Sequence, residues 1–169
     1  MAGPRPLLLV DVDGVISLFG FAPHERPAGT WTTVDGHPHL LSATAGAHLR
    51  RLAATFELAW CTGWEERANE YLPHALALPG PLPHLAFDRD PAGPPPPPRA
   101  HWKLAGIDAF AGADRPLAWV DDAFNDACHA WAAARPGPTL LVPTETHVGL
   151  TAAHVEELER WAAALERSR

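Results

Sequence analysis

Short apolar runs alternate with longer amphipathic segments along this chain. The run Leu7–Val10 is apolar at every position and is followed at once by acidic residues. Such a run is typical of a strand that is buried on both faces of a sheet. Further runs of this kind, the last of them edge-like, are Phe56–Cys61, Leu117–Val120, Thr139–Val142 and Leu85–Phe87. We therefore expect about five strands.

The segments between these runs have the periodicity of helices. Ala43–Ala54 places Leu49 and Leu52 on one face, and Thr151 is the expected N-cap of an amphipathic C-terminal helix. The other expected helices are Glu65–Tyr71, ended by Pro73, then His101–Phe110 and Ala123–Arg135. This alternation predicts an α/β fold with a Rossmann-like parallel sheet and helices on both faces.

Residues 17–42 interrupt the alternation. Val34-Asp35-Gly36-His37 contains an Asp-Gly pair, which is a hairpin signal. We expect a short flap or hairpin over the site, too small to be a separate cap domain. Three aromatic residues of this segment are expected to pack against the domain edge, with stacking on a substrate as the alternative: Phe19, Phe21 and Trp31. His37 and His39 lack the further spaced Cys or His residues that a zinc site requires.

Length and composition favour one globular domain, residues 1–169. The chain has 47% apolar and 20% charged residues. No apolar run approaches the roughly 20 residues that span a bilayer, and Leu7–Val10 is too short for a signal peptide. Cys61 and Cys128 form no disulfide framework, and Cys61 is expected in the core. We expect a cytoplasmic protein without membrane contact, and the many Pro and Ala residues suggest a GC-rich bacterial genome.

Charge and proline content bear on partners. A net charge of −7 argues against a broad basic surface for nucleic acid. Five consecutive prolines, Pro94–Pro98, lie in a proline-rich stretch at about residues 88–99. We expect a solvated, extended connecting loop, with docking to an aromatic groove of another protein as the alternative.

Two carboxylates stand where the first apolar run ends. Asp11 and Asp13 are one residue apart, and Gly14 permits a turn that a Cβ atom would resist. At the carboxyl end of a parallel strand they would face the crevice where open α/β sheets bind ligands. A polar loop that caps the strand is the alternative. A divalent cation would relieve the repulsion between the acids, and oxygen ligands of this kind suit Mg²⁺.

Thr62-Gly63-Trp64 follows the second apolar run. A hydroxyl at the carboxyl end of a strand can donate to a phosphoryl oxygen, with the adjacent amides pointing the same way. The alternative makes Thr62 a helix N-cap with Glu65 completing a capping box. The two roles are compatible.

A lysine and an acidic pair complete the set. Lys103, the only lysine of the chain, opens an expected helix, and Asp121-Asp122 follow the run Leu117–Val120. A surface lysine is the alternative for Lys103, and helix N-capping explains one carboxylate of the pair. An acidic pair at a strand end beside the same crevice favours a metal site.

These motifs, in this order, resemble those of the haloacid dehalogenase-like (HAD) hydrolase superfamily. Its four motifs correspond to Asp11-x-Asp13, Thr62, Lys103 and Asp121-Asp122. Within it, the chain is most similar to the HAD domain family of Swiss Army Knife RNA repair proteins. The stretches that carry this narrower resemblance are Leu9–Val15, Glu57–Asn69, Arg115–Asp122 and Gly149–Thr151 with the helix that follows.

The resemblance implies a phosphatase that works through an aspartyl-phosphate. Asp11 would attack phosphorus, and Asp13 would protonate the leaving oxygen and then activate water. Thr62 and Lys103 would stabilise the phosphoryl oxygens. Mg²⁺ would be held by Asp11, the backbone carbonyl of Asp13 and the Asp121/Asp122 pair, without a choice between the two. The acid at Asp13 separates the chain from dehalogenases, and no Asp-Lys-Thr-Gly-Thr motif of transport ATPases is present.

The substrate is less determined. The RNA-repair resemblance and an Asp-Asp motif similar to that of polynucleotide end phosphatases suggest a phosphate on an RNA or DNA end. Gly14, Gly63, Trp64 and Arg67 are the expected substrate-binding residues, with Trp31 as a further stacking surface. A small-metabolite or nucleotide phosphatase is the alternative. A non-catalytic HAD-fold binding module that uses the proline run is an alternative of another class, although it predicts a broken motif.

Overall fold

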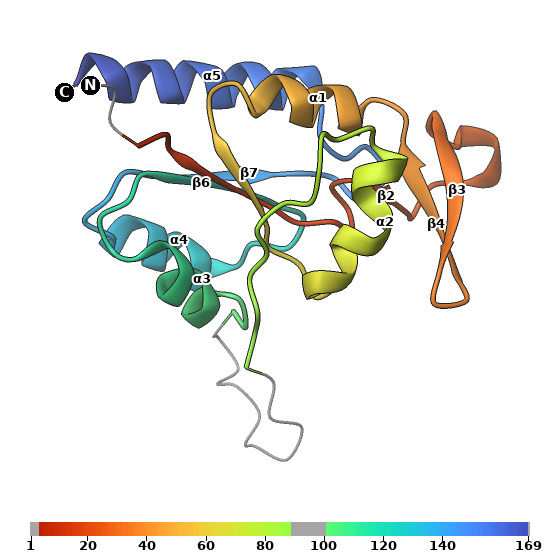
Figure 1. Ribbon diagram of the computed structural model, residues 1–169, viewed down its shortest axis with the longest axis horizontal. Coiled ribbons are helices and arrows are strands. Elements are labelled where there is room, and N and C mark those ends of the chain that lie inside the picture. Colours follow the sequence, from red (N-terminus) through yellow and green to blue (C-terminus); the bar gives the residue numbers. More distant parts are fainter. Residues whose placement is uncertain (1–3, 89–100, 169) are drawn as a thin grey trace.

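The computed structural model describes residues 4–88 and 101–168. Within these residues a parallel sheet of four strands, in the order β5-β1-β6-β7, lies at the centre of the molecule (Figure 1). The strands are β1 (Leu7–Val10), β5 (Glu57–Trp60), β6 (Leu117–Asp121) and β7 (Thr139–Pro143). The expected α/β class with a parallel sheet is confirmed. The expected proline-rich loop lies, from residue 89 onward, outside the described residues.

Strand β1 has a neighbour on each side because the chain adds β5 along one edge and β6 along the other. Its last residue, Val10, is level with Trp60 and Val120. All four side chains of β1 are buried, which explains why the run is apolar throughout. A change of direction in strand order leaves a crevice at the carboxyl ends of the strands, where ligands of such sheets bind.

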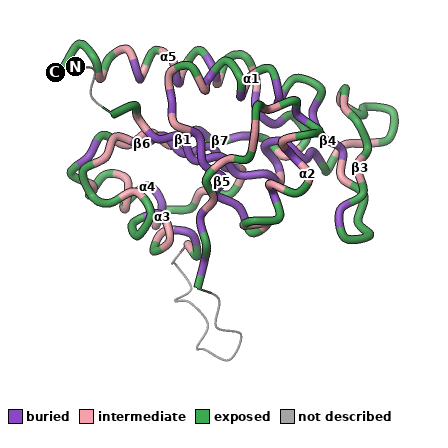
Figure 2. Tube along the Cα trace, in the orientation of Figure 1, coloured by how far each residue is buried: buried purple, intermediate pink, exposed green. Residues whose placement is uncertain are grey.

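Helices cover both faces of this sheet (Figures 1 and 2). One face packs against α1, α2 and α5 in one hydrophobic cluster. The opposite face packs against α3 and α4 in a second cluster, which includes both cysteines, Cys61 and Cys128. The helices are α1 (Ala45–Leu52), α2 (Ala68–Ala75), α3 (Leu104–Ala111), α4 (Asp126–Ala134) and α5 (Ala152–Arg167).

Side-chain caps determine where two helices begin. Thr151 caps α5 as expected, in a capping box with His154. Helix α4 begins at Asp126 rather than at Ala123, because the Asn125 side chain accepts a hydrogen bond from the Cys128 amide and caps the helix there. In the described part of the chain, none of the helices has the length and apolarity needed to cross a membrane.

A small antiparallel sheet extends from one end of the molecule (Figure 1). It has the order β2-β4-β3, with β2 (Ser17–Leu18), β3 (Gly29–Val34) and β4 (His37–Ser42), and a 3-10 turn, η1 (Pro23–Glu25), precedes β3. The Asp-Gly turn joins β3 to β4, with positive φ at both residues, so the expected hairpin is confirmed. The expected packing of the aromatic residues is wrong for Phe19 and Trp31, which are 48% and 51% exposed.

Two further expectations about the elements are wrong. Leu85–Phe87 is not a strand: only His84 forms a bridge with β5, and the Phe87 amide donates to the Glu65 carboxylate instead of a strand partner. Helix α2 continues past Pro73 to Ala75. It loses one amide donor there and still closes its end with a bond from the Leu76 amide to the Leu72 carbonyl.

Candidate active site

Three carboxylates meet at the carboxyl ends of β1 and β6. Among the described residues, Asp11, Asp121 and Asp122 form a group whose ligand atoms all lie within 4.8 Å of one another. Asp11 follows β1 and donates its amide to the Val120 carbonyl of β6, which explains why it is level with Asp121. Asp11 and Asp121 are buried and Asp122 is half-buried. A group of this composition can hold a metal ion.

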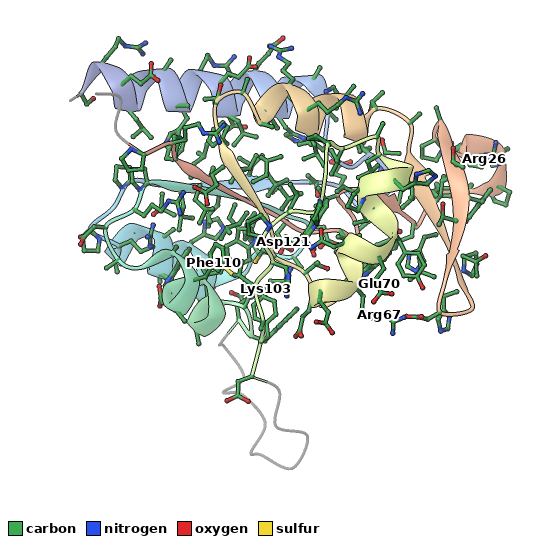
Figure 3. The ribbon with its side chains drawn as sticks, viewed as in Figure 1. Arg26, Arg67, Glu70, Lys103, Phe110 and Asp121 are labelled. Atoms are coloured by element: carbon green, nitrogen blue, oxygen red, sulfur yellow. The ribbon has the colours of Figure 1, made fainter. Side chains whose placement is uncertain are left out.

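A buried ammonium lies between two of these acids. Lys103, directly before α3, is 3% exposed, and its Nζ is 3.0 Å from Asp11 Oδ1 and 2.6 Å from Asp121 Oδ2. Figure 3 labels Lys103 and Asp121 close to each other near the centre of the molecule. Burial alone lowers the pKa of Lys103, but Asp11 and then Asp121 outweigh it and raise that pKa. The two carboxylates therefore favour the charged form of this buried lysine.

Asp121 is fixed by more than the lysine. Its Oδ2 also accepts a hydrogen bond from the Trp119 indole at 3.2 Å, and its Oδ1 accepts one from the Ala123 amide at 3.0 Å. Both oxygens therefore have donors. The neighbouring Asp122 approaches the turn after β1, where a Cβ on Gly14 would fall 2.4 Å from Asp122 Oδ2. Gly14 is required twice, for this approach and for its φ of +77°.

Burial and the neighbouring acid raise the pKa values of two carboxyl groups in this site. Burial raises the pKa of Asp11 to about 7, opposed by Lys103 and aided by Asp121. Burial and then Asp121 also raise the pKa of Asp122. Without a cation, the group therefore tends to retain a proton near neutral pH. A divalent cation would remove this cost, and a donor set made only of carboxylate oxygens fits a hard cation.

The carboxylate of Asp13 lies outside this group. Its Oδ2 accepts a hydrogen bond from the Trp64 indole at 3.0 Å, and its Oδ1 is 3.8 Å from Nδ1 of His39. His39 comes from the hairpin strand β4, and no sequence motif assigns it to this site. Its contact with Asp13 depends on how the hairpin strands are paired. The local sequence predicts the turn of the hairpin but not this contact.

Thr62 is buried one residue after Cys61, whose amide donates to the Val10 carbonyl of β1. Its hydroxyl accepts a hydrogen bond from the Trp64 amide at 3.3 Å. The expected capping box is wrong. Glu65 has φ +51° and directs its carboxylate to the Phe87 amide, and the short 3-10 helix η2 (Glu65–Arg67) has no side-chain cap.

A cleft of about 210 Å³ separates the hairpin tip from the loop after β5. Arg67 pairs with Asp35 across it and reaches toward the hairpin, as Figure 3 shows. Of the expected substrate-binding residues, Gly63, Trp64 and Arg67 line this cleft, whereas Gly14 lies under Asp122. The residues that line the cleft are Val34, Asp35, His37, His39, Gly63, Trp64 and Arg67. Because His39 and Trp64 both contact Asp13, the cleft borders that carboxylate.

Comparisons with known proteins give a structural likeness alone. No family model matches the chain, and no curated protein matches it. One similar solved structure is the hypothetical protein XCC2798 from Xanthomonas campestris, with 14% identity and a TM-score of 0.49 over 97% of this chain and 86% of that one.

Proposed function

We propose that this chain is a Mg²⁺-dependent phosphatase that hydrolyses phosphomonoesters through an aspartyl-phosphate on Asp11. The observation that carries the proposal is the buried Lys103 ammonium, held between Asp11 and Asp121 in a group of three carboxylates at the strand ends. A cation beside a buried carboxylate supports a role in stabilising phosphoryl charge. The motif order that resembles HAD hydrolases supports the same assignment.

Asp11, Asp121 and Asp122 are the side chains that would hold Mg²⁺. Their oxygen donors suit this ion, and burial raises the pKa of Asp11 and of Asp122 although Lys103 offsets part of the negative charge. When bound, the ion would neutralise carboxylate and phosphoryl charge together. Asp122 is favoured as a direct ligand over Asp121, because both Asp121 oxygens already accept hydrogen bonds.

The protein's own groups account for each proton. The Asp11 carboxylate forms a bond to phosphorus while the bond to the leaving oxygen breaks, and Asp13 gives its proton to that oxygen. Water then attacks the phosphorus of the aspartyl-phosphate and gives a proton to Asp13, while the bond from phosphorus to the Asp11 oxygen breaks, which releases phosphate and restores the Asp11 carboxylate and the Asp13 acid. Lys103 and the Thr62 hydroxyl stabilise the phosphoryl oxygens. The hydroxyl accepts from the Trp64 amide with a lone pair, so its proton remains to be donated.

For the substrate, we favour the phosphate of an RNA or DNA end. The cleft beside Asp13 offers the Trp64 ring for base stacking and Arg67 for a backbone phosphate, and it is open to solvent. A small metabolite or nucleotide is the second candidate. The small volume of the cleft, about 210 Å³, favours a small metabolite or nucleotide, and so does the net charge of −7, which disfavours a long polyanion.

The test is phosphate release with Mg²⁺ from p-nitrophenyl phosphate, nucleotides, sugar phosphates and 3′-phosphorylated oligonucleotides. We expect wild-type activity on at least one of them and a loss of at least about 10³-fold in Asp11→Asn, since the nucleophile is removed. The matched control is Asp114→Asn at an exposed acid. Activity that survives in Asp11→Asn contradicts the mechanism. Inactivity of the wild type on the whole panel, with metal bound, favours the non-catalytic module.

A further inference from the structure

Two ring side chains from distant segments approach the carboxylate of Asp13. Trp64, from the loop after β5, donates its indole N–H to Oδ2 at 3.0 Å. His39, from the hairpin strand β4, brings Nδ1 within 3.8 Å of Oδ1. The two rings meet edge to face, with centroids 4.9 Å apart and an interplanar angle of 70°. The Asp13 side chain is 48% exposed, so solvent on its open side leaves its orientation to these contacts on the other.

His39 is itself fixed from behind. Its Nδ1 shares a hydrogen bond of 2.8 Å with the Ser17 hydroxyl on β2. Ser17 pairs with Leu41 of β4 and bridges Asp13 through the backbone. Turning the imidazole away from Asp13 would therefore break its hydrogen bond to Ser17.

We propose that His39 is a positioning residue that holds the Asp13 carboxyl group toward the cleft, so that the hairpin forms part of the acid–base machinery. This inference rests on the proposed phosphatase function. A proton donor must lie within hydrogen-bond reach of the leaving oxygen, and a half-exposed aspartate without restraint samples several rotamers. The Trp64 indole holds Oδ2 by a hydrogen bond, and the His39 ring packs against Trp64 and stands 3.8 Å from Oδ1, so the two rings together restrict the carboxyl group at the border of the cleft.

The role predicts a dependence on the leaving group. Asp13 donates its proton to the ester oxygen as the bond from phosphorus to that oxygen breaks. The 4-nitrophenolate ion leaves without protonation, whereas an alkoxide does not. Misplacing Asp13 should therefore slow alkyl phosphates far more than p-nitrophenyl phosphate. A merely structural role of His39 would slow both substrates equally.

The experiment compares kcat/KM for p-nitrophenyl phosphate and for a small alkyl phosphate in four proteins. His39→Leu should lose about 10- to 100-fold on the alkyl phosphate and less than about 3-fold on p-nitrophenyl phosphate. His39→Asn, whose amide can take the place of Nδ1, should recover most of the loss. His24→Leu, an exposed histidine outside the cleft, should behave as wild type on both substrates.

Each other outcome overturns the proposal in a distinguishable way. Equal losses on both substrates in His39→Leu, or no loss on either, would overturn the positioning role and leave the phosphatase intact. A wild-type protein that releases phosphate from neither substrate, nor from any other member of the panel, would overturn the phosphatase proposal and this inference together. If His39→Leu does not fold, as judged by circular dichroism, Ser17→Ala gives the same readout. It removes the anchor of His39 and should show the same selective loss, whereas an unchanged substrate ratio would overturn the role.

Discussion

At the scale of single residues, the surroundings of Asp11 disfavour its charged form. It is buried beside two acids and one ammonium, and burial raises its pKa to about 7 from an ordinary value of 3.8. Between about pH 4 and pH 7, the folded protein therefore holds a proton that the unfolded chain releases. The linked stability is present at low pH and is lost as pH rises through this window.

We expect this linkage to be measurable in urea unfolding of the metal-free protein at several pH values. The free energy of unfolding of the wild type should fall relative to Asp11→Asn as pH rises from 4 to 8, by roughly 1–3 kcal/mol. Asp114→Asn, at an exposed acid, should run parallel to the wild type. Parallel curves for wild type and Asp11→Asn would refute the raised pKa of Asp11.

The site residues that strand pairing places were predictable from the sequence, whereas those placed by the hairpin and by side-chain direction were not. Asp11 and Asp121 follow apolar runs, and strands paired in register place the residues after them side by side. The sequence therefore predicted that they meet. His39 and Trp64 reach Asp13 through the pairing of a hairpin and the direction of two side chains. Neither leaves a periodic signal, so the orientation of Asp13 was not predictable.

At the scale of elements, the turn after β1 requires glycine at position 14, because the Asp122 side chain packs closely against it. Gly14→Ala should lower the free energy of unfolding by about 2–4 kcal/mol, because the new Cβ meets Asp122 and φ is +77°. Gly36→Ala is the matched control, with φ +80° and nothing within 4 Å of its Cβ. It should cost only about 1 kcal/mol. Equal losses in urea denaturation would show that the contact with Asp122 carries no cost.

Element prediction worked best where burial decided the pattern. Strands β1 and β6 are covered on both faces, so every position of β1 and every position of β6 before Asp121 is apolar, which made both runs recognisable in the sequence. The expected strand at Leu85–Phe87 failed because a single side-chain acceptor, Glu65, takes the Phe87 amide. Hydrophobic periodicity does not indicate whether a backbone amide will bond to a strand or to a side-chain acceptor.

At the scale of the whole molecule, a bound cation should stabilise the fold, because the acids come together only when the sheet has formed. Mg²⁺ at ten times its Kd adds about 1.4 kcal/mol, which corresponds to a rise in Tm of about 3–6 °C for a chain of this size. Asp122→Asn should show a smaller rise, since a ligand oxygen is lost. Calorimetry with KCl at matched ionic strength separates this effect from screening, and an equal rise in KCl would exclude a specific site.

The exposed tip of the hairpin has an evolutionary consequence. The proposed nucleophile, the proposed acid and its holder all lie within residues 11–39, while the Asp35-Gly36 turn packs against no neighbour at Gly36. Extra residues inserted at such a turn cost little stability, because the cost of closing a loop grows slowly with its length. A lineage with this architecture can therefore acquire a larger roof over the cleft, and new substrates, by lengthening one turn while every reacting group stays in place.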